Sequence, residues 1–118
     1  MNYKIVVLED AERDIKELKI YIVNNFSKEI WYKSYNKIKV AVAELKRSPL
    51  TGSIPPELNK FNLSQYRQIL SGMNRIIYEV RKNTIYIHIV ADQRRDMMSL
   101  VTTRLLRSNS TDKDKFLA

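Results

Sequence analysis

The stretch RIIYEVRKNTIYIHIVA, residues 75–91, decides the fold of this chain. Two runs rich in β-branched and aromatic residues, 75–81 and 84–91, are separated only by Lys82-Asn83. Such runs favour the pleated backbone of a strand, and a two-residue connection reverses the chain. The stretch therefore predicts two antiparallel strands joined by a tight turn.

A further run lies just upstream: YRQIL, residues 66–70, which Ser71-Gly72 separates from the hairpin. Consecutive hairpins predict a three-stranded antiparallel meander. Successive side chains of a strand point to opposite faces. In the last strand this alternation predicts an aliphatic face of Ile85, Ile87 and Ile89 and a mixed face of Tyr86, His88 and Val90.

The N-terminal part has helical periodicity after one short strand. YKIVVL, residues 3–8, predicts the strand, and Asp10 is the expected N-cap of a first helix that ends at Asn24-Asn25. Ser27 is the expected N-cap of a second helix that reaches about residue 47. Because the connection is short, the two helices are expected to form an antiparallel hairpin. Their apolar stripes are Ala11, Ile15, Leu18 and Ile22, and then Trp31, Tyr35, Ile38, Val42 and Leu45.

Prolines and glycine end the helical part. Pro49, Gly52 and Pro55-Pro56 predict the end of the second helix and an extended stretch beyond it. After the meander, a last short helix is expected from about Asp96 to Arg107, with an apolar stripe of Met97, Leu100, Val101 and Leu105.

The resulting fold class is α+β, with an N-terminal strand, an antiparallel helical hairpin, a three-stranded antiparallel meander and a short C-terminal helix. We expect one domain over residues 1–107. The tail, residues 108–118, has no periodicity and is predicted to fray.

Composition narrows the class of protein. The chain has 118 residues, a net charge of +8, one histidine and no cysteine. Disulfides and thiolate metal sites are therefore excluded, and a transition-metal site is not expected. No apolar run reaches the roughly 18 residues needed to cross a bilayer, and the N-terminus lacks the pattern of a signal peptide. We expect a soluble cytoplasmic protein without a membrane partner.

The positive charge is concentrated in the middle and C-terminal parts of the sequence, within 28–47, 60–82 and 83–107. One interpretation is a polyanionic partner, either nucleic acid or an acidic protein. The other is a solvated surface that keeps the protein soluble. A charge this large on a small domain repels itself, which favours the first interpretation.

Motifs of common enzymes are absent. The sequence contains no GxxxxGK[ST], GxGxxG, GxSxG or HExxH, so we expect no cofactor. Trp31, Tyr32 and Tyr35 suggest a base-stacking platform. However, Trp31 and Tyr35 fall on the apolar stripe, so they are expected in the core and only Tyr32 is expected to be exposed.

Several segments of the second half, in this order and spacing, resemble the RelE/ParE superfamily of toxins: PEL (56–58), YRQIL (66–70), RIIYEVRKNTIYIHIV (75–90), DQRRDMMSL (92–100) and RLL (104–106). The resemblance covers roughly residues 3–107. It implies a type II toxin–antitoxin system with an acidic cognate antitoxin that is partly disordered before binding, and contact with operator DNA only through that antitoxin. A positively charged toxin suits such a partner.

The resemblance leaves two targets open. RelE-like toxins cut mRNA in the ribosomal A site, whereas ParE-like toxins poison DNA gyrase. Metal-free RNA cleavage needs a base, an acid and cations for the phosphorane. By resemblance the candidate catalytic residues are Arg67, Arg75, Arg94 and Arg95. The second active-site lysine of RelE-like toxins is Ile69 here, and their aromatic acid is replaced by Met97 or Met98, which cannot transfer a proton.

Other ionisable residues have two interpretations each. His88 is either a general base or a half-buried residue of the sheet. Glu79 is either a base or a surface group that pairs with Arg75 and Arg81. The cluster Asp92, Arg94, Arg95 and Asp96 is either a phosphate- or partner-binding corner or a set of mutual ion pairs, with Asp96 as the cap of the last helix.

The nuclease set is incomplete, and the long basic second helix resembles the extended hairpin of ParE-like toxins. This resemblance favours a ParE-like gyrase poison that acts by binding, without chemistry of its own. The candidate partner-binding residues are Lys33, Lys37, Arg67, Arg75, Arg81, Arg94, Arg95 and Arg104. The alternatives are a ribosome-dependent, metal-independent mRNA interferase and a non-toxic module that binds only an antitoxin or DNA.

Overall fold

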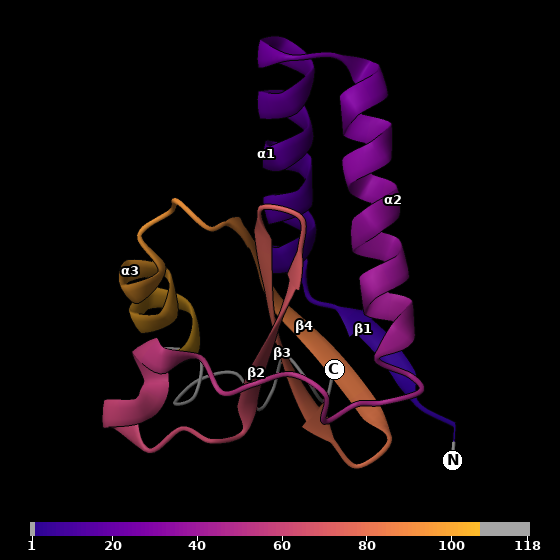
Figure 1. Ribbon diagram of the computed structural model, residues 1–118. Coiled ribbons are helices and arrows are strands. Elements are labelled where there is room, and N and C mark those ends of the chain that lie inside the picture. Colours follow the sequence, from indigo (N-terminus) through magenta and orange to yellow (C-terminus); the bar gives the residue numbers. More distant parts are fainter. Residues whose placement is uncertain (1, 107–118) are drawn as a thin grey trace.

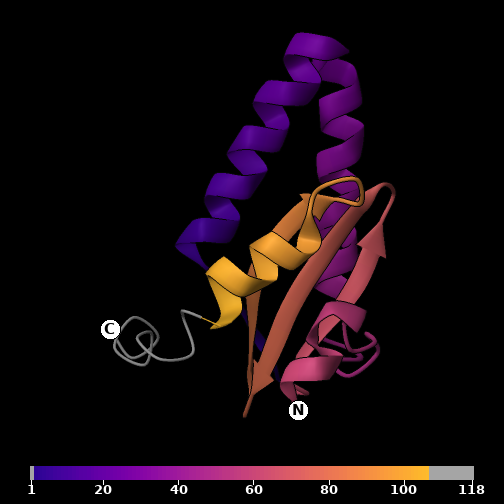
Figure 2. The ribbon, with the colours of Figure 1, turned by 90° about the vertical axis from the view of Figure 1, so that its left-hand side faces the viewer.

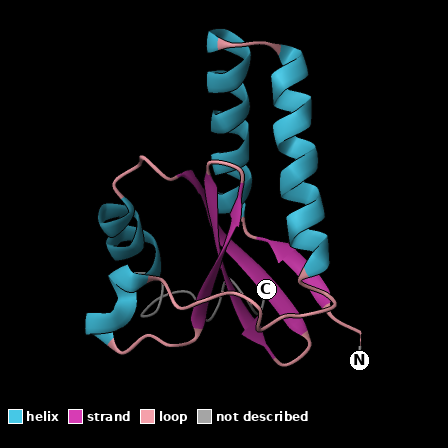
Figure 3. Ribbon diagram, viewed as in Figure 1, coloured by secondary structure: helices cyan, strands magenta, loops and turns pink. Residues whose placement is uncertain are grey.

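The computed structural model describes residues 2–106 and has the α+β fold that the sequence predicts (Figures 1 and 3). The order of elements is strand, two helices, three strands and a C-terminal helical segment. The tail predicted over 108–118 lies outside the described residues, as does Arg107. The elements are β1 (Lys4–Val7), α1 (Glu9–Asn25), α2 (Lys28–Glu44), η1 (Pro56–Phe61), β2 (Tyr66–Ser71), β3 (Asn74–Arg81), β4 (Thr84–Asp92), α3 (Met97–Val101) and η2 (Thr102–Leu106).

The four strands form one sheet in the order β1-β4-β3-β2. The antiparallel pairs β2–β3 and β3–β4 confirm the predicted meander. β1 joins the far edge of the sheet parallel to β4, with Lys4 opposite Thr84 and Val7 opposite Ile87. The helical hairpin follows β1 and leads to β2 at the opposite edge of the sheet, and it packs against one face.

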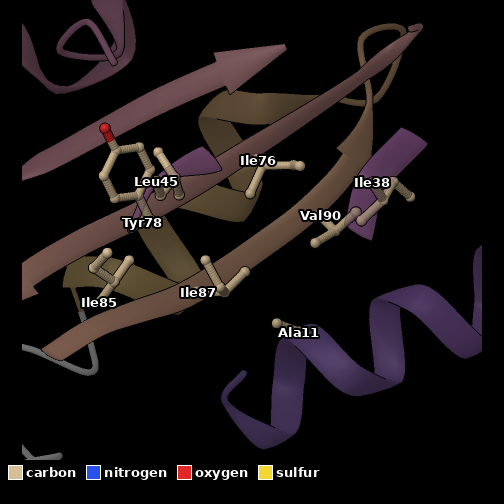
Figure 4. Packing of buried hydrophobic residues seen from close by; sticks show 8 residues of the cluster. All are labelled: Ala11, Ile38, Leu45, Ile76, Tyr78, Ile85, Ile87 and Val90. Carbon is tan, nitrogen blue, oxygen red and sulfur yellow. The ribbon is translucent and has the colours of Figure 1, made fainter. Parts of the chain in front are cut away.

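Each face of the sheet has its own core. The hairpin covers one face (Figure 4), where the buried cluster is Ala11, Ile38, Leu45, Ile76, Tyr78, Ile85, Ile87 and Val90. On the other face η1 and the C-terminal helical segment cover a second cluster of Leu58, Tyr66, Ile77, Ile89, Ala91, Met97, Val101 and Leu105. Figure 2 shows the outer half of the hairpin extending beyond the end of the sheet.

The alternation predicted for β4 is wrong beyond Ile87. Tyr78 lies opposite Ile87 and Ile77 lies opposite Ile89, so β4 has one extra residue, His88, between these two pairs. Such a β-bulge sends two successive residues toward the same face. Ile89 therefore packs in the second cluster, and Val90 takes its place in the first.

The helix starts agree with the sequence in two of three cases. The Ser27 hydroxyl accepts a hydrogen bond from the Ile30 amide at 3.1 Å, which confirms the cap of α2. The Asp96 carboxylate accepts from the Ser99 amide at 3.2 Å, which confirms the cap of the last helix. Asp10 is not a cap, because α1 already begins at Glu9.

The segment after the prolines is also not extended throughout as predicted: it contains the 3₁₀ helix η1, and Leu58 of η1 is buried. A proline at the first helical position has the φ angle that a helix needs, so Pro56 begins a helix instead of preventing one. None of the helices within residues 2–106 has the length and apolar character to span a membrane.

Candidate functional site

Arg67 of β2 holds the loop that precedes it in the sequence. Its Nη1 donates to the backbone carbonyls of Gly52 at 2.7 Å and Leu50 at 3.2 Å. The Tyr78 hydroxyl fixes the same loop, since it donates to the Pro49 carbonyl at 2.7 Å and accepts from the Gly52 amide at 2.9 Å. A Cβ at Gly52 would lie 2.6 Å from the Gln68 carbonyl oxygen, so only glycine fits. The candidate catalytic residue Arg67 therefore supports a loop.

Arg75 is held by a carboxylate from η1. Its Nη1 and Nη2 donate to the two Glu57 oxygens at 2.9 and 2.7 Å, and its Nε donates to the Gln68 side chain at 2.7 Å. The hydrogen bonds from Arg75 keep the pKa of the Glu57 carboxyl below its usual value. The predicted pairing of Arg75 with Glu79 is wrong, and the pairing with Glu57 was missed because the sequence analysis assigned an extended stretch where η1 forms.

Glu79, His88 and Arg81 form one hydrogen-bonded network on the second face of the sheet, in which Glu79 and His88 are buried. The Glu79 carboxylate lies 3.0 Å from His88 Nε2 and accepts from Arg81 Nε at 2.9 Å. The ring of Tyr66 stands edge-on to His88, with the ring centres 5.2 Å apart. Burial would raise the pKa of Glu79, but the hydrogen bonds from His88 and Arg81 outweigh it and lower that pKa. His88 lies on the same face of β4 as Tyr86, which is opposite Glu79 in the ladder, as the alternation predicts.

β1 pairs only with the first part of β4, from Thr84 to Ile87. Beyond that point Arg104 of η2 binds the same edge of β4. Its Nη1 donates to the His88 carbonyl at 3.1 Å, and its Nη2 pairs with the Asp14 carboxylate of α1. Asp14 in turn accepts from the Val90 amide at 3.0 Å. Burial raises the pKa of Asp14, against the effect of these hydrogen bonds. The sequence analysis missed Asp14, since nothing in a helical stripe reveals a contact with a residue 90 positions away.

The corner after β4 contains one ion pair, between Arg94 and Asp92. Arg94 Nε donates to Asp92 at 2.9 Å, and this contact lowers the pKa of Asp92. Arg95 is exposed, and Asp96 caps α3. Met97, one of the two methionines at the position of an expected acid, is buried in the second core cluster.

On α2 the candidate lysines are exposed. Lys33 lies 4.0 Å from Glu29, a distance at which the ion pair is weak, and 74% of its side chain is exposed. Lys37 borders a groove beside the hairpin. Trp31 is buried and stacked on Tyr35 with the ring centres 5.2 Å apart, whereas Tyr32 is exposed, as expected.

Two adjoining hollows lie between α1 and the sheet. One, of about 280 Å³, lies beside the open edge of β4 and is bordered by Asp14, Glu17 and Arg95. The other, of about 350 Å³, lies between the hairpin and the β2–β3 turn. Leu18, Tyr21, Asp92 and Arg94 border both. Within residues 2–106 no three His, Cys, Asp or Glu side chains are placed to hold a metal ion.

The candidate residues thus fall into separate places. Arg67, Arg75, Arg81 and Arg104 each donate to a carbonyl or a carboxylate of the protein itself. The exposed candidates are Lys33, Lys37, Arg94 and Arg95. The candidate arginines of the meander are therefore engaged by partners within the protein, and the exposed candidates lie on α2 and at the corner after β4.

Comparison with known proteins agrees with this fold. Residues 5–97 match the model of the family described as the ParE toxin of type II toxin–antitoxin systems, parDE. No curated protein matches the sequence. Among solved structures, the chain is similar to a chromosomal ParDE system from P. aeruginosa, with a TM-score of 0.63 and 15% identity over 76% of this chain and 95% of that one.

Two RelE-type structures are also similar. The free E. coli toxin RelE, as a double arginine mutant, has a TM-score of 0.59 and 14% identity over 85% of this chain and 93% of that one. A RelBE toxin–antitoxin complex from Mycobacterium tuberculosis has a TM-score of 0.54 and 20% identity over 78% and 99%. At these identities the structures show the fold alone, whereas the family match covers most of the chain. The chain belongs to the ParE toxin family of type II toxin–antitoxin systems, within the RelE/ParE superfamily.

Proposed function

We propose that this toxin inhibits growth by poisoning DNA gyrase, that a cognate acidic antitoxin neutralises it, and that both contacts are made in the cytoplasm. The observation that carries the proposal is the engagement of the meander arginines inside the protein. The Nε, Nη1 and Nη2 atoms of Arg75 all donate to Gln68 or Glu57, and Arg67 donates to two backbone carbonyls. Cations that stabilise a phosphorane must have donors directed at the substrate.

Membership of the ParE family supports the same proposal, because gyrase is the target that the resemblance implies for ParE-like toxins. A poison that acts by binding needs exposed contact residues and no acid–base pair. The basic side of α2, with Lys33 and Lys37, and the exposed Arg95 supply such residues.

The test is a supercoiling assay with purified gyrase, relaxed plasmid and ATP. Inhibited supercoiling together with accumulated linear DNA is the expected result. Unchanged supercoiling at a large excess of toxin would remove the proposal.

The alternative is a ribosome-dependent mRNA interferase. One observation favours it: a carboxylate, an imidazole and a guanidinium, from Glu79, His88 and Arg81, lie in one hydrogen-bonded network. These are the residue types that metal-free cleavage needs. Primer extension on ribosome-bound mRNA tests it, and cleavage that Glu79→Gln abolishes in a folded protein would establish it. A non-toxic module, the third possibility, would cause no growth defect on expression.

A further inference from the structure

A groove of about 480 Å³ lies along the hairpin on the side of β1. It is bordered mainly by apolar and aromatic side chains: Val7 of β1, Ile15 of α1, and Trp31, Tyr32 and Tyr35 of α2. None of the described residues that border this groove borders the two hollows between α1 and the sheet. The groove is therefore a separate surface of the hairpin.

The aromatic side chains of this groove form a stacked pair with an exposed ring beside it. The rings of Trp31 and Tyr35 lie 19° from parallel, with their centres 5.2 Å apart, and Lys39 Nζ lies 4.9 Å from the centre of the Tyr35 ring. Trp31 is buried in this packing, whereas Tyr32 is 65% exposed. An aromatic side chain loses little conformational entropy when another ring stacks on it, because it has only two rotatable bonds. Tyr32 therefore offers a stacking surface at the groove.

The surroundings of the groove are positively charged. Lys16 and Lys19 of α1 border it, and Lys39 lies over the Tyr35 ring. All three lysines are exposed, and the ion pairs found within residues 2–106 include none of them. Glu12 is the one acid among the described residues that border the groove. The charge favours an anionic partner over a second copy of the same surface, since two copies would bring like charges together.

An exposed aromatic ring among unpaired lysines is the combination with which proteins bind single-stranded nucleic acid. The bases stack on the rings and the phosphates meet the cations. A base can reach Tyr32 only if it is unpaired, because a duplex keeps its bases stacked inside. An acidic peptide would match the lysines but would supply no base for the ring.

We propose that this groove binds single-stranded DNA, with an unpaired base stacked on Tyr32 and phosphates against Lys16, Lys19 and Lys39. The choice of DNA over RNA rests on the proposed function, because gyrase acts on DNA. The groove thus gives the toxin a direct contact with the nucleic acid of its target, separate from any contact with DNA through the antitoxin.

The first test titrates the purified full-length toxin into labelled oligo(dU) of about 12 nucleotides, a length typical of single-strand binding sites, and follows fluorescence anisotropy. Tyr32→Ala is expected to raise the dissociation constant at least about fivefold, which corresponds to the loss of one stacked base. Tyr32→Phe keeps the ring and is expected to restore binding. Phe26→Ala is the matched control, because Phe26 is 61% exposed but does not border the groove. Equal effects of Tyr32→Ala and Phe26→Ala, or a loss in Tyr32→Phe, would overturn the proposal.

The second test measures the salt dependence of the same binding. For single strands, the logarithm of the binding constant falls with the logarithm of the salt concentration, with a slope of about 0.7 per phosphate contacted. Lys16→Ala and Lys19→Ala are each expected to reduce this slope by about 0.7. Lys46→Ala, at an exposed lysine that does not border the groove, is expected to leave it unchanged. An equal change in all three variants would mean that net charge acts and not the groove, which contradicts the proposal.

Competition with other polyanions tests the kind of partner. A DNA duplex of the same length is expected to compete weakly, and its own binding is expected to be insensitive to Tyr32→Ala, because its bases are not available for stacking. Polyglutamate that displaces oligo(dU) at equal charge would assign the groove to an acidic protein. A preference of about tenfold or more for oligo(U) over oligo(dU) would assign it to RNA. Either of these two results would overturn the proposal.

The supercoiling assay separates this inference from the proposed target. If the toxin inhibits gyrase, Tyr32→Ala is expected to raise the concentration for half-inhibition and Tyr32→Phe to restore it. Inhibition that Tyr32→Ala leaves intact, or inhibition by a toxin that does not bind oligo(dU), would overturn the groove assignment and leave the proposed function standing. A toxin that binds oligo(dU) through Tyr32 but leaves gyrase active would have the opposite meaning: the proposed function would fail and the binding site would stand.

Discussion

The buried arginines of the meander and of η2 and the exposed lysines of α2 have similar chemistry and opposite surroundings. Arg75 and Arg104 have side chains that are 12% and 17% exposed, and each is paired with a carboxylate. The side chain of Lys33 is exposed to solvent, and its partner Glu29 lies 4.0 Å away. Buried, paired charges affect stability when one member is removed, because the other is left uncompensated. Exposed charge is what a partner meets first. The same sign of charge therefore stabilises the fold in one region and is left accessible to a partner in the other.

The largest effect is expected for Arg75→Ala. The substitution removes a two-armed contact to Glu57 and leaves that carboxylate partly buried without a counter-charge. We expect a loss of about 2–4 kcal/mol in the free energy of unfolding, somewhat below the cost of breaking a fully buried pair. Urea unfolding followed by circular dichroism measures it. Stability equal to that of Lys33→Ala would show that Arg75 does not hold η1 to the sheet, and would return it to the list of catalytic candidates.

A smaller loss is expected when the edge of β4 is opened. Arg104→Ala removes the donor to the His88 carbonyl and the partner of Asp14. We expect a cost of about 1–3 kcal/mol, since two partly buried polar groups lose a hydrogen bond. Hydrogen exchange is the sharper readout: protection is expected to fall at Val90, whose amide binds Asp14. Exchange that rises equally in β2 would indicate global unfolding instead.

The sequence predicts the local elements of the fold better than the contacts between distant segments. The stripes of α1 and α2 and the runs of the meander are periodic, so their elements and their antiparallel order follow from local pattern. The parallel pairing of β1 with β4 does not, because it joins Lys4 to Thr84 across 80 positions. The bulge at His88 was equally hidden, since the aliphatic alternation continues through it without interruption.

The site was predicted less well than the fold for the same reason. Exposed Lys33 and Lys37 could be identified because the polar side of an amphipathic helix faces solvent. The predicted pairing of Arg81 with Glu79 is confirmed, whereas the partners of Arg75 and Arg104 were missed, because ion pairs between distant segments have no sequence period. At the β2–β3 turn, Ser71 Oγ and Asn74 Oδ1 are buried without a hydrogen-bond partner among the described residues, which depends on the packing around the turn. Within that turn, only Gly72 could be recognised from the sequence as a turn residue, and its φ of +59° is one that favours glycine.

The Arg75–Glu57 pair also predicts an acid dependence. Arg75 lowers the pKa of Glu57 in the folded state relative to the unfolded chain. The pair therefore contributes its full stability above the unfolded pKa, about 4.3, and loses it as the pH falls through the folded pKa. Glu57→Gln is expected to be less stable than the unmodified protein at pH 7, by an amount that shrinks in acid. Urea midpoints at several pH values test this. Glu29→Gln, at an exposed position of α2, is the control, and the same convergence there would remove the assignment to Glu57.

The smallest effect is expected for the exposed lysines of α2. Lys33→Ala removes a charge that contributes little to the fold, so its Tm is expected to match that of the unmodified protein. If the basic side of α2 meets gyrase or its DNA, the toxin concentration for half-inhibition of supercoiling should rise about two- to fivefold, which corresponds to a single exposed charge contact. The rise should diminish as salt is added, because exposed charges are screened. Lys60→Ala removes the same net charge from η1 and is expected to leave inhibition unchanged. An equal response of the two variants would mean that net charge acts and not the position of Lys33, and the exposed lysines of α2 would then have no special part in binding.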